Sequence, residues 1–444
     1  MPVRWNAMGY PQKKVSEVSK NRRGRAAGKV SMALALMMAF VMAITALTGT
    51  AQARHRHAKR PAKPAVSQSA QQQSQENQAK MPKRTAEPVL RIGLQQGKSS
   101  FTVMPLADKL QLRTESSKAY PLKAAAPVEI RWQNGSFLVG KEKLKGERLQ
   151  LMPAAVLTDA AHFSLSGRSY RGTLEILAKK GGLTAVNLVP LDDYLLSVVP
   201  EEMPTDWPAE ALKAQSVAAR SFALHNRDRH AADGFDLCTT THCQVYTGTS
   251  AEKTAATNAI RATQGEVLFY GSEPIDALFH TDSGGMTENS ENVWGSFVPY
   301  LRAVKDTANG TMPWTKEIGI AAFEQKLAAK GHNVGKIRSL SLSSLKIGKA
   351  ASDRTASGRV KTMTVKGTKG TAALTGNELR SLFGLKSTLF DAKLQGSKVV
   401  FSGFGFGHGL GISQWGAERL AAGGMKYDAI LHHYYADVTL KKMY

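Results

Sequence analysis

Short alternating runs of apolar and polar residues fill the chain from Val89 to Asn187. Such alternation has the period of a strand with one buried face. Between two of these runs, Gln133-Asn134-Gly135 predicts a hairpin turn. We therefore expect this part of the chain to be mainly β-structure and to act as a scaffold rather than as a substrate platform.

A denser apolar stretch follows, from Leu191 to Leu224. Its first part, Leu195 to Val199, reads as buried and ends at Pro200. Because Pro204 interrupts the chain again, we expect Glu201 and Glu202 to lie in a constrained turn.

A helix is predicted from Ala209 to His225. Pro208 suits its first turn, and Thr205 and Asp206 are the candidate caps. Small residues recur along it and would let neighbouring backbone approach closely, which is typical of a buried helix: Ala211, Ala214, Ala218 and Ala219.

Beyond this helix the pattern is mixed. We predict helices at 251–263, 321–329, 377–383 and 413–421, and strands at 266–270, 276–280, 337–345, 359–365 and 399–405. No regular alternation of strand and helix appears, so the predicted fold class is α+β. A β-rich part, 88–190, precedes a helix-containing catalytic part, 191–444, and together they form one domain, 88–444.

The N-terminal segment, residues 1–53, has the composition of an export signal. A basic stretch leads into an apolar run from Val30 to Leu47, and Ala51-Gln52-Ala53 supplies a small-residue cleavage site. The apolar run also reaches the lower limit for spanning a bilayer, so an uncleaved anchor is the alternative. Residues 54–87, rich in Lys, Arg, Pro, Gln and Ser, read as a disordered linker.

The chain of 444 residues carries a net charge of +24. Residues 1–87 hold 16 Lys and Arg against three acids, and the rest holds 43 against 32. A basic exported protein predicts an anionic partner outside the cytosol, such as acidic wall glycans, anionic lipid or teichoic-type polymers. The export signal and the lack of a nucleic-acid motif argue against nucleic acid.

Glu201 and Glu202 are adjacent carboxylates beside an apolar run. Burial would raise the pKa of such a carboxyl group and make it a general acid near neutral pH. Alternatively, both are solvated charges stabilised by a helix N-terminus. The residues alone leave both interpretations open.

The chain has two cysteines, Cys238 and Cys243, in the string C-T-T-T-H-C. An even pair in an exported protein predicts a disulfide. Two thiolates with His242 between them and His230 upstream equally predict a metal site with the nitrogen and sulfur ligands that zinc prefers.

Two further strings superficially resemble motifs of other protein classes. Asp282-Ser283-Gly284-Gly285 resembles the nucleophile string of chymotrypsin-like proteases, but the rest of that signature is missing. The glycine loop from Gly405 to Gly411 has the wrong spacing for a dinucleotide site. We discount both interpretations and take His280, Ser283 and Glu288 as second-tier residues, more structural than catalytic.

Four strings in order resemble the SpoIID/LytB domain family, known from sporulation lytic transglycosylases and amidase-enhancer proteins. They are VVPEEMP with WPAEALKAQSVAARSFAL, LCTTTHCQVYTG, HTDSGGMTENSENVWG and FGFGHGLGISQWGA. The resemblance extends from about Val89 to the C-terminus.

The resemblance implies an exported peptidoglycan lytic transglycosylase that uses one glutamate, Glu202, as general acid and base. It implies zinc at Cys238, Cys243, His242 and His230. Substrate contacts are expected from a cleft that includes Ser283, His408, Ser413 and Gln414.

The expected partners are peptidoglycan glycan strands and an N-acetylmuramoyl-L-alanine amidase, with the membrane contacted only through an uncleaved N-terminal segment. The alternative function is a non-catalytic wall-binding enhancer of such an amidase. A zinc hydrolase that uses the cysteine-histidine site directly is a third hypothesis.

Overall fold

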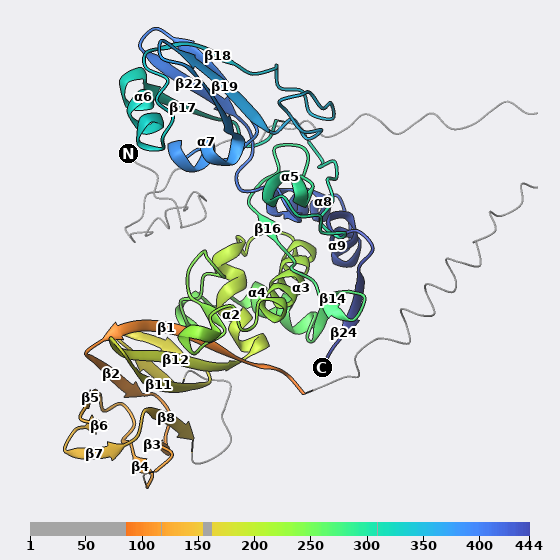
Figure 1. Cartoon of the computed structure of the whole chain (residues 1–444). Coiled ribbons are helices and arrows are strands. Elements are labelled where there is room, and N and C mark those ends of the chain that lie inside the picture. The colour runs from red at the N-terminus through yellow and green to blue at the C-terminus, as the bar shows by residue number, and fades with distance from the viewer. Residues whose placement is uncertain (1–85, 117, 154–161, 309) are drawn as a thin grey trace, which may run out of the picture. The chain divides into compact units, whose positions relative to one another are not determined.

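The computed structural model describes residues 86–116, 118–153, 162–308 and 310–444 (Figure 1). The predicted export signal, and all but the last two residues of the predicted linker, lie outside these ranges. Within the described ranges, no helix combines the length and the apolar composition needed to cross a membrane. The fold is α+β with a β-rich N-terminal half, as predicted.

The N-terminal half consists of strands β1 to β12. Their bounds are β1 Val89–Lys98, β2 Ser100–Pro105, β3 Leu110–Arg113, β4 Tyr120–Pro121, β5 Val128–Gln133, β6 Ser136–Val139, β7 Glu142–Lys145, β8 Arg148–Pro153, β9 Phe163–Leu165, β10 Arg168–Tyr170, β11 Thr173–Lys179 and β12 Gly182–Pro190. Together with β13, Leu237–Cys238, they form two sheets, ordered β13-β1-β12-β11-β8-β3-β4 and β10-β9-β2-β5-β6-β7.

The predicted hairpin turn is confirmed. Gln133 pairs with Ser136, which leaves Asn134 and Gly135 as a two-residue loop. Both have positive φ, 49° and 71°, as a type I′ turn requires.

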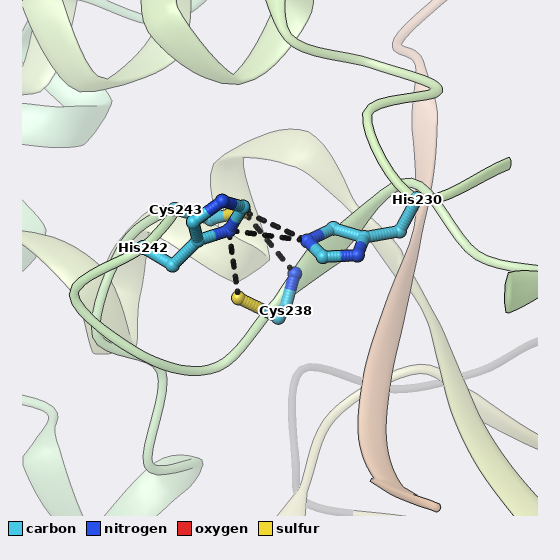
Figure 2. Close-up of side chains that lie close together, drawn as sticks. All are labelled: His230, Cys238, His242 and Cys243. Atoms are coloured by element: carbon cyan, nitrogen blue, oxygen red, sulfur yellow. Dashed lines mark hydrogen bonds between the residues drawn. The ribbon is translucent and has the colours of Figure 1, made fainter.

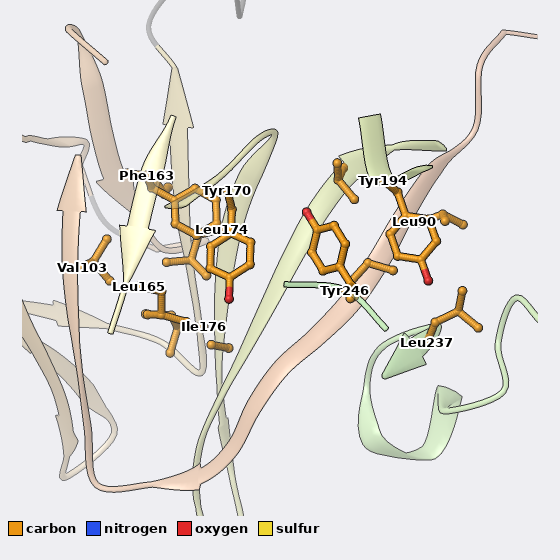
Figure 3. Close-up of a cluster of buried hydrophobic side chains, with 14 of the residues drawn as sticks. Leu90, Val103, Phe163, Leu165, Tyr170, Leu174, Ile176, Tyr194, Leu237 and Tyr246 are labelled. Atoms are coloured by element: carbon orange, nitrogen blue, oxygen red, sulfur yellow. The ribbon is translucent and has the colours of Figure 1, made fainter. Parts of the chain in front are cut away.

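The two sheets share one hydrophobic core. Figure 3 shows side chains from both, such as Val103 and Ile176, in the same cluster as two tyrosines from later elements. Tyr194 and Tyr246 are buried with ring centroids 5.1 Å apart. Since Tyr194 belongs to the next helix and Tyr246 to a later loop, the core fixes both against the sheets.

Helix α2, Leu191–Glu202, corrects one prediction. Glu201 and Glu202 are its last two residues and do not lie in a turn, because the helix continues past Pro200. Proline removes one donor, yet the Met203 N–H still bonds the Val199 carbonyl at 3.0 Å and closes the last turn.

Helix α3, Ala209–His225, has the predicted bounds and is largely buried. Pro208 is its N-cap, without a side-chain hydrogen bond, so the caps expected at Thr205 and Asp206 are wrong. Helix α4, Thr254–Ala262, is shorter than predicted because the chain before it forms the 3₁₀ turn η2, Thr249–Ala251.

A second core surrounds α3. The remaining elements outside the module described next are η1 Ala231–Asp233, β13 Leu237–Cys238, β14 Glu266–Tyr270, β15 Glu273–Pro274, β16 Phe279–His280, α5 Ser290–Trp294, β23 Ile412–Ser413, α8 Gln414–Ala422, α9 Tyr427–Tyr434 and β24 Thr439–Lys442.

Residues 314–403 form a module with a core of its own, which we call the inserted module. Its elements are β17 Trp314–Gly319, α6 Ile320–Ala329, β18 Ile337–Ser341, β19 Thr362–Gly367, β20 Thr371–Thr375, α7 Gly376–Phe383, β21 Phe390–Gln395 and β22 Lys398–Gly403 (Figure 1). β16 and β23 pair in parallel on either side of it in the sequence. The module is therefore an insertion in the sequence between two strands that pair with each other.

Several predicted strands have different bounds. The one expected at 276–280 is reduced to the pair in β16, and the one at 337–345 ends at Ser341. The one at 359–365 begins only at Thr362, since buried Arg359 leaves the strand to bond the Ser283 carbonyl at 2.8 Å.

Candidate active site beside a cysteine and histidine cluster

Glu202 lies at the end of α2 with its side chain buried, 1% exposed. Oε1 accepts a hydrogen bond from the Val245 N–H at 3.3 Å, and buried Oε2 has no partner in the described part of the chain. Burial raises the pKa of Glu202 to about 8; the Val245 hydrogen bond opposes this rise and the charge of Glu201 adds to it. At neutral pH the carboxyl group is therefore protonated and can donate a proton.

Glu201 has a different environment. It is partly exposed, and its Oε1 accepts a hydrogen bond from the Thr247 hydroxyl at 2.9 Å. Of the two adjacent carboxyl groups, the second is the buried acid.

The segment 244–248 wraps around the end of α2. Ser197 Oγ accepts hydrogen bonds from the Thr247 and Gly248 N–H groups, each at 3.1 Å. The Tyr194 hydroxyl donates to Gln244 Oε1 at 3.3 Å. These contacts hold the Val245 N–H against Glu202.

Sequence reasoning missed Ser197, Gln244 and Val245. Three of the contacts around the end of α2 use backbone N–H groups, those of Val245, Thr247 and Gly248, which every residue type except proline supplies. The only available signal was the position of the string QVYTG directly after Cys243.

His230, Cys238, His242 and Cys243 form a cluster whose ligand atoms all lie within 4.8 Å of one another (Figure 2). Cys243 Sγ is 3.5 Å from His230 Nε2 and 3.6 Å from His242 Nδ1. Cys238 Sγ is 3.7 Å from His242 Nδ1, and the two histidine nitrogens are 3.3 Å apart. Both cysteines are free thiols, so the disulfide alternative is not what the structure contains. The cluster has the composition of a site that could bind a metal ion.

The surrounding fold orients these ligands. β13 carries Cys238 and pairs in parallel with β1, placing Cys238 opposite Gly93. His230 Nδ1 lies 3.1 Å from Asp233 Oδ2, so the Nε2 atom of His230 is directed at the cluster.

The two thiols differ in acidity. Burial works against the Cys238 thiolate, but hydrogen bonds from Thr240, His242 and Cys243 outweigh it and lower the pKa of Cys238 to about 7. Burial raises the pKa of Cys243 to about 11.

The cluster residue Cys243 lies two positions before Val245, whose N–H bonds Glu202. Cys243 belongs to the cluster. The next residue, Gln244, accepts a hydrogen bond from the Tyr194 hydroxyl, and the Val245 N–H bonds Glu202. A change in the position of Cys243 therefore reaches the carboxyl group through a short stretch of backbone.

Three of the four predicted substrate residues make hydrogen bonds to Glu202 or to one another. Gln414 is buried and donates from Nε2 to the Glu202 carbonyl at 3.0 Å. Ser413 is the N-cap of α8, where its Oγ accepts from the Gly416 N–H at 3.3 Å and from the Ser283 N–H at 3.1 Å. Buried Ser283 donates from Oγ to Asp306 Oδ2 at 2.6 Å.

His408 uses both ring nitrogens within the fold. The Leu410 N–H donates to Nδ1 at 3.0 Å, so Nε2 carries the hydrogen that bonds the Phe279 carbonyl at 3.1 Å. Burial lowers the pKa of His408 to about 4, aided by the charges of Arg380 and Arg359. The ring is neutral, and substrate contact by His408 stays a prediction, as it does for Ser283, Ser413 and Gln414.

Among the second-tier residues, Glu288 is buried with a full set of donors. It accepts from the Asn289 N–H and Asn292 Nδ2, each at 2.9 Å, from Thr355 Oγ1 at 2.5 Å and from Ser357 Oγ at 2.6 Å. Buried His280 bonds the Leu410 carbonyl through Nδ1 at 3.1 Å.

Comparison with known proteins places these residues in a family. A family model described as "Stage II sporulation protein" matches residues 179–270, which hold Glu202 and all four residues of the cluster. Stage II sporulation protein D of Bacillus amyloliquefaciens is 34% identical over 279 residues, covering 58% of this chain and 76% of that protein. The chain belongs to the SpoIID/LytB family.

Other SpoIID/LytB relatives agree with this assignment. Stage II sporulation protein D of Bacillus subtilis is 36% identical over 279 residues, with the same coverage of 58% and 76%. The amidase enhancer of Bacillus subtilis is 31% identical over 358 residues, covering 70% of this chain and 49% of that protein. A second family model, a domain of unknown function, matches residues 289–411 and includes the inserted module.

Proposed function

We propose that this chain is an exported peptidoglycan lytic transglycosylase with Glu202 as its general acid and base. The relatives named stage II sporulation protein D and amidase enhancer support a role connected with the cell wall. The observation that carries the finer proposal is the buried carboxyl group of Glu202, whose Oε2 has no partner in the described ranges and whose pKa is about 8. The protein would act in the cell wall, released or anchored by its N-terminal segment.

In the proposed reaction, the protonated Glu202 donates its proton to the glycosidic oxygen that follows muramic acid, and the bond from C1 to that oxygen breaks. The resulting carboxylate accepts the proton of the same sugar's C6 hydroxyl. The C6 oxygen then bonds C1 and closes an anhydro ring, so no water is consumed. One carboxyl group performs both transfers, unlike the pair that hydrolytic glycosidases use.

The cysteine and histidine cluster fits zinc. Tetrahedral zinc has ligand distances of about 2.3 Å to sulfur and about 2.0 Å to nitrogen, which places sulfur and nitrogen ligands about 3.5 Å apart and two nitrogens about 3.3 Å apart. The distances of 3.5–3.7 Å and 3.3 Å in the cluster match this arrangement. His230, Cys238, His242 and Cys243 would hold the ion, which would brace the loop that carries Val245.

The second candidate is a non-catalytic enhancer of an N-acetylmuramoyl-L-alanine amidase. The likeness to the amidase enhancer of Bacillus subtilis favours it. Glu202 would then be a buried carboxylic acid with no catalytic role. An amidase partner also suits the enzyme, because an amidase would supply glycan strands free of stem peptides.

The test is mass spectrometry of peptide-free glycan strands incubated with the full-length protein, with zinc content measured on the same sample. Fragments ending in anhydro-muramic acid, one water lighter than hydrolysis products, are expected. Hydrolysed ends would instead support a hydrolase. Intact strands from folded, zinc-loaded protein, together with faster cleavage by an added amidase, would support the enhancer.

A further inference from the structure

The net positive charge of residues 88–444 comes entirely from the inserted module. Residues 314–403 hold 16 Lys and Arg against five acids, whereas residues 88–313 and 404–444 together hold 27 of each. The rest of the fold is therefore neutral, and the module alone carries a net charge of +11. A difference of this size between two parts of one chain indicates an anionic partner for the module.

Most of these cations face solvent. All twelve lysines of the module and Arg338 are exposed, while Arg354 and Arg359 are buried. Two of the module's five acids form ion pairs with exposed lysines, Glu317 with Lys398 at 2.6 Å and Glu324 with Lys336 at 3.1 Å. Acid partners within the module are thus too few to neutralise its surface.

Two neighbouring hollows lie in the surface of the module. One, of about 390 Å³, is lined by Lys336, Lys369, Gln325 and Asn333. The other, of about 380 Å³, is lined by Lys330 and Asn377, and His332 belongs to both.

The two acids in these hollows are engaged by the fold. Glu324 accepts the Ile337 N–H at 2.9 Å besides its bond to Lys336. Glu378 closes the capping box of α7 with Thr375. Lys336 bonds Glu324, and Asn377 donates from Nδ2 to the Val293 carbonyl at 2.7 Å, so Lys330, Lys369, Gln325 and Asn333 remain as the groups that line the hollows toward solvent.

We propose that the inserted module binds a carboxylate-bearing glycan strand across the two hollows that meet at His332. Lysine ammonium groups would pair with the spaced carboxylates, and the amides of Gln325 and Asn333 would bond hydroxyl and acetamido groups. In peptidoglycan freed of stem peptides, each muramic acid carries such a carboxylate on its lactyl group. The identity of the strand rests on the proposed function, whereas the binding step requires no cleavage.

The surface favours a glycan over a membrane. None of the large exposed apolar side chains of the described residues belongs to the module; they are Val89, Leu106, Trp132, Tyr270, Trp294 and Phe297. Membrane-surface proteins bury an apolar face in the lipid headgroups beside their basic residues. Hollows lined by amides suit a polymer with hydroxyl groups between its charges.

The experiment measures equilibrium binding of full-length Glu202→Gln protein to peptide-free glycan strands, so that cleavage cannot interfere. The test variant adds Lys330→Gln, Lys336→Gln and Lys369→Gln. The matched control instead adds Lys141→Gln, Lys143→Gln and Lys145→Gln, three equally exposed lysines in the N-terminal sheets. The test variant should bind about tenfold more weakly, and added salt should weaken binding by the parent protein.

Strands whose lactyl carboxylates are esterified should bind as weakly as the test variant binds free strands. Equal binding by the test and control variants would overturn the proposal. The proposal would also be overturned if the protein bound phosphatidylglycerol vesicles or a polyol phosphate polymer but not the glycan. Because the assay measures binding alone, a protein that binds strands through the module but never cleaves them would contradict only the proposed enzyme activity.

Discussion

Two buried glutamates, at the end of α2 and at the turn before α5, differ in what surrounds their carboxyl groups. Glu202 has one hydrogen bond at 3.3 Å, and its Oε2 has no partner among described residues. Glu288 accepts four hydrogen bonds of 2.5–2.9 Å. A full set of donors holds the buried carboxyl group of Glu288 in place, whereas burial with few donors leaves Glu202 with its proton. The second condition is the one a general acid needs.

The largest expected effect is on stability and has opposite signs at the two sites. Glu288→Gln should lower the free energy of unfolding by about 3 kcal/mol, because the amide nitrogen that replaces one carboxylate oxygen would face the two donors which that oxygen now accepts. Glu202→Gln should not destabilise the protein. Burial raises the pKa of Glu202 from its ordinary 4.5 to about 8, so the wild type loses stability as pH rises between these values, and the glutamine variant does not.

Between pH 4.5 and pH 7 the wild type should lose roughly 3 kcal/mol of its free energy of unfolding through this effect, and Glu202→Gln should lose none of it. Urea unfolding of both variants and the wild type at pH 5 and pH 7 measures it. If both variants lost stability equally at pH 7, the two carboxyl environments would not differ as described.

The next effect concerns the cysteine and histidine cluster, which could bind a metal ion and whose Cys243 lies two positions before Val245. Asp233→Ala removes the carboxylate 3.1 Å from His230 Nδ1 and should weaken metal affinity by about 10- to 100-fold. Competition with a zinc chelator measures the affinity. Asp228→Ala, an acid in the same loop without a contact to a ligand, is the control, and equal affinities for the two variants would contradict the role of Asp233.

A smaller effect is the pH dependence of glycan cleavage. The proposed reaction would start from protonated Glu202, whose pKa is about 8. The rate should therefore be steady through neutral pH and fall about tenfold for each pH unit above that value. Initial rates on peptide-free strands between pH 6 and pH 10 measure this profile.

Glu201→Gln provides the control for this profile. Its charge helps to raise the pKa of Glu202, so its removal should move the fall in rate to lower pH by less than about one pH unit. A profile that fell only below pH 5 would assign the reaction to an ordinary, ionised carboxylate.

The sequence predicts part of this picture because side-chain patterns encode it. Alternation marks the strands of the N-terminal half, small residues mark α3, and Asn134-Gly135 marks a hairpin. The helical position of Glu202 was not predicted, since Pro200 and Pro204 indicate a constrained turn, whereas α2 contains Pro200 and continues to Glu202. The different environments of Glu202 and Glu288 depend on backbone N–H groups and on residues up to 69 positions away, which spacing does not reveal.

The measurement that tests the account most directly compares the products of the wild type, Glu201→Gln and Glu202→Gln on peptide-free glycan strands. Mass spectrometry should find anhydro-ended fragments from the wild type and Glu201→Gln. Glu202→Gln, shown to be folded and to hold its metal, should form them at least about a hundredfold more slowly. Undiminished anhydro products from Glu202→Gln would contradict the assignment of Glu202 as the general acid.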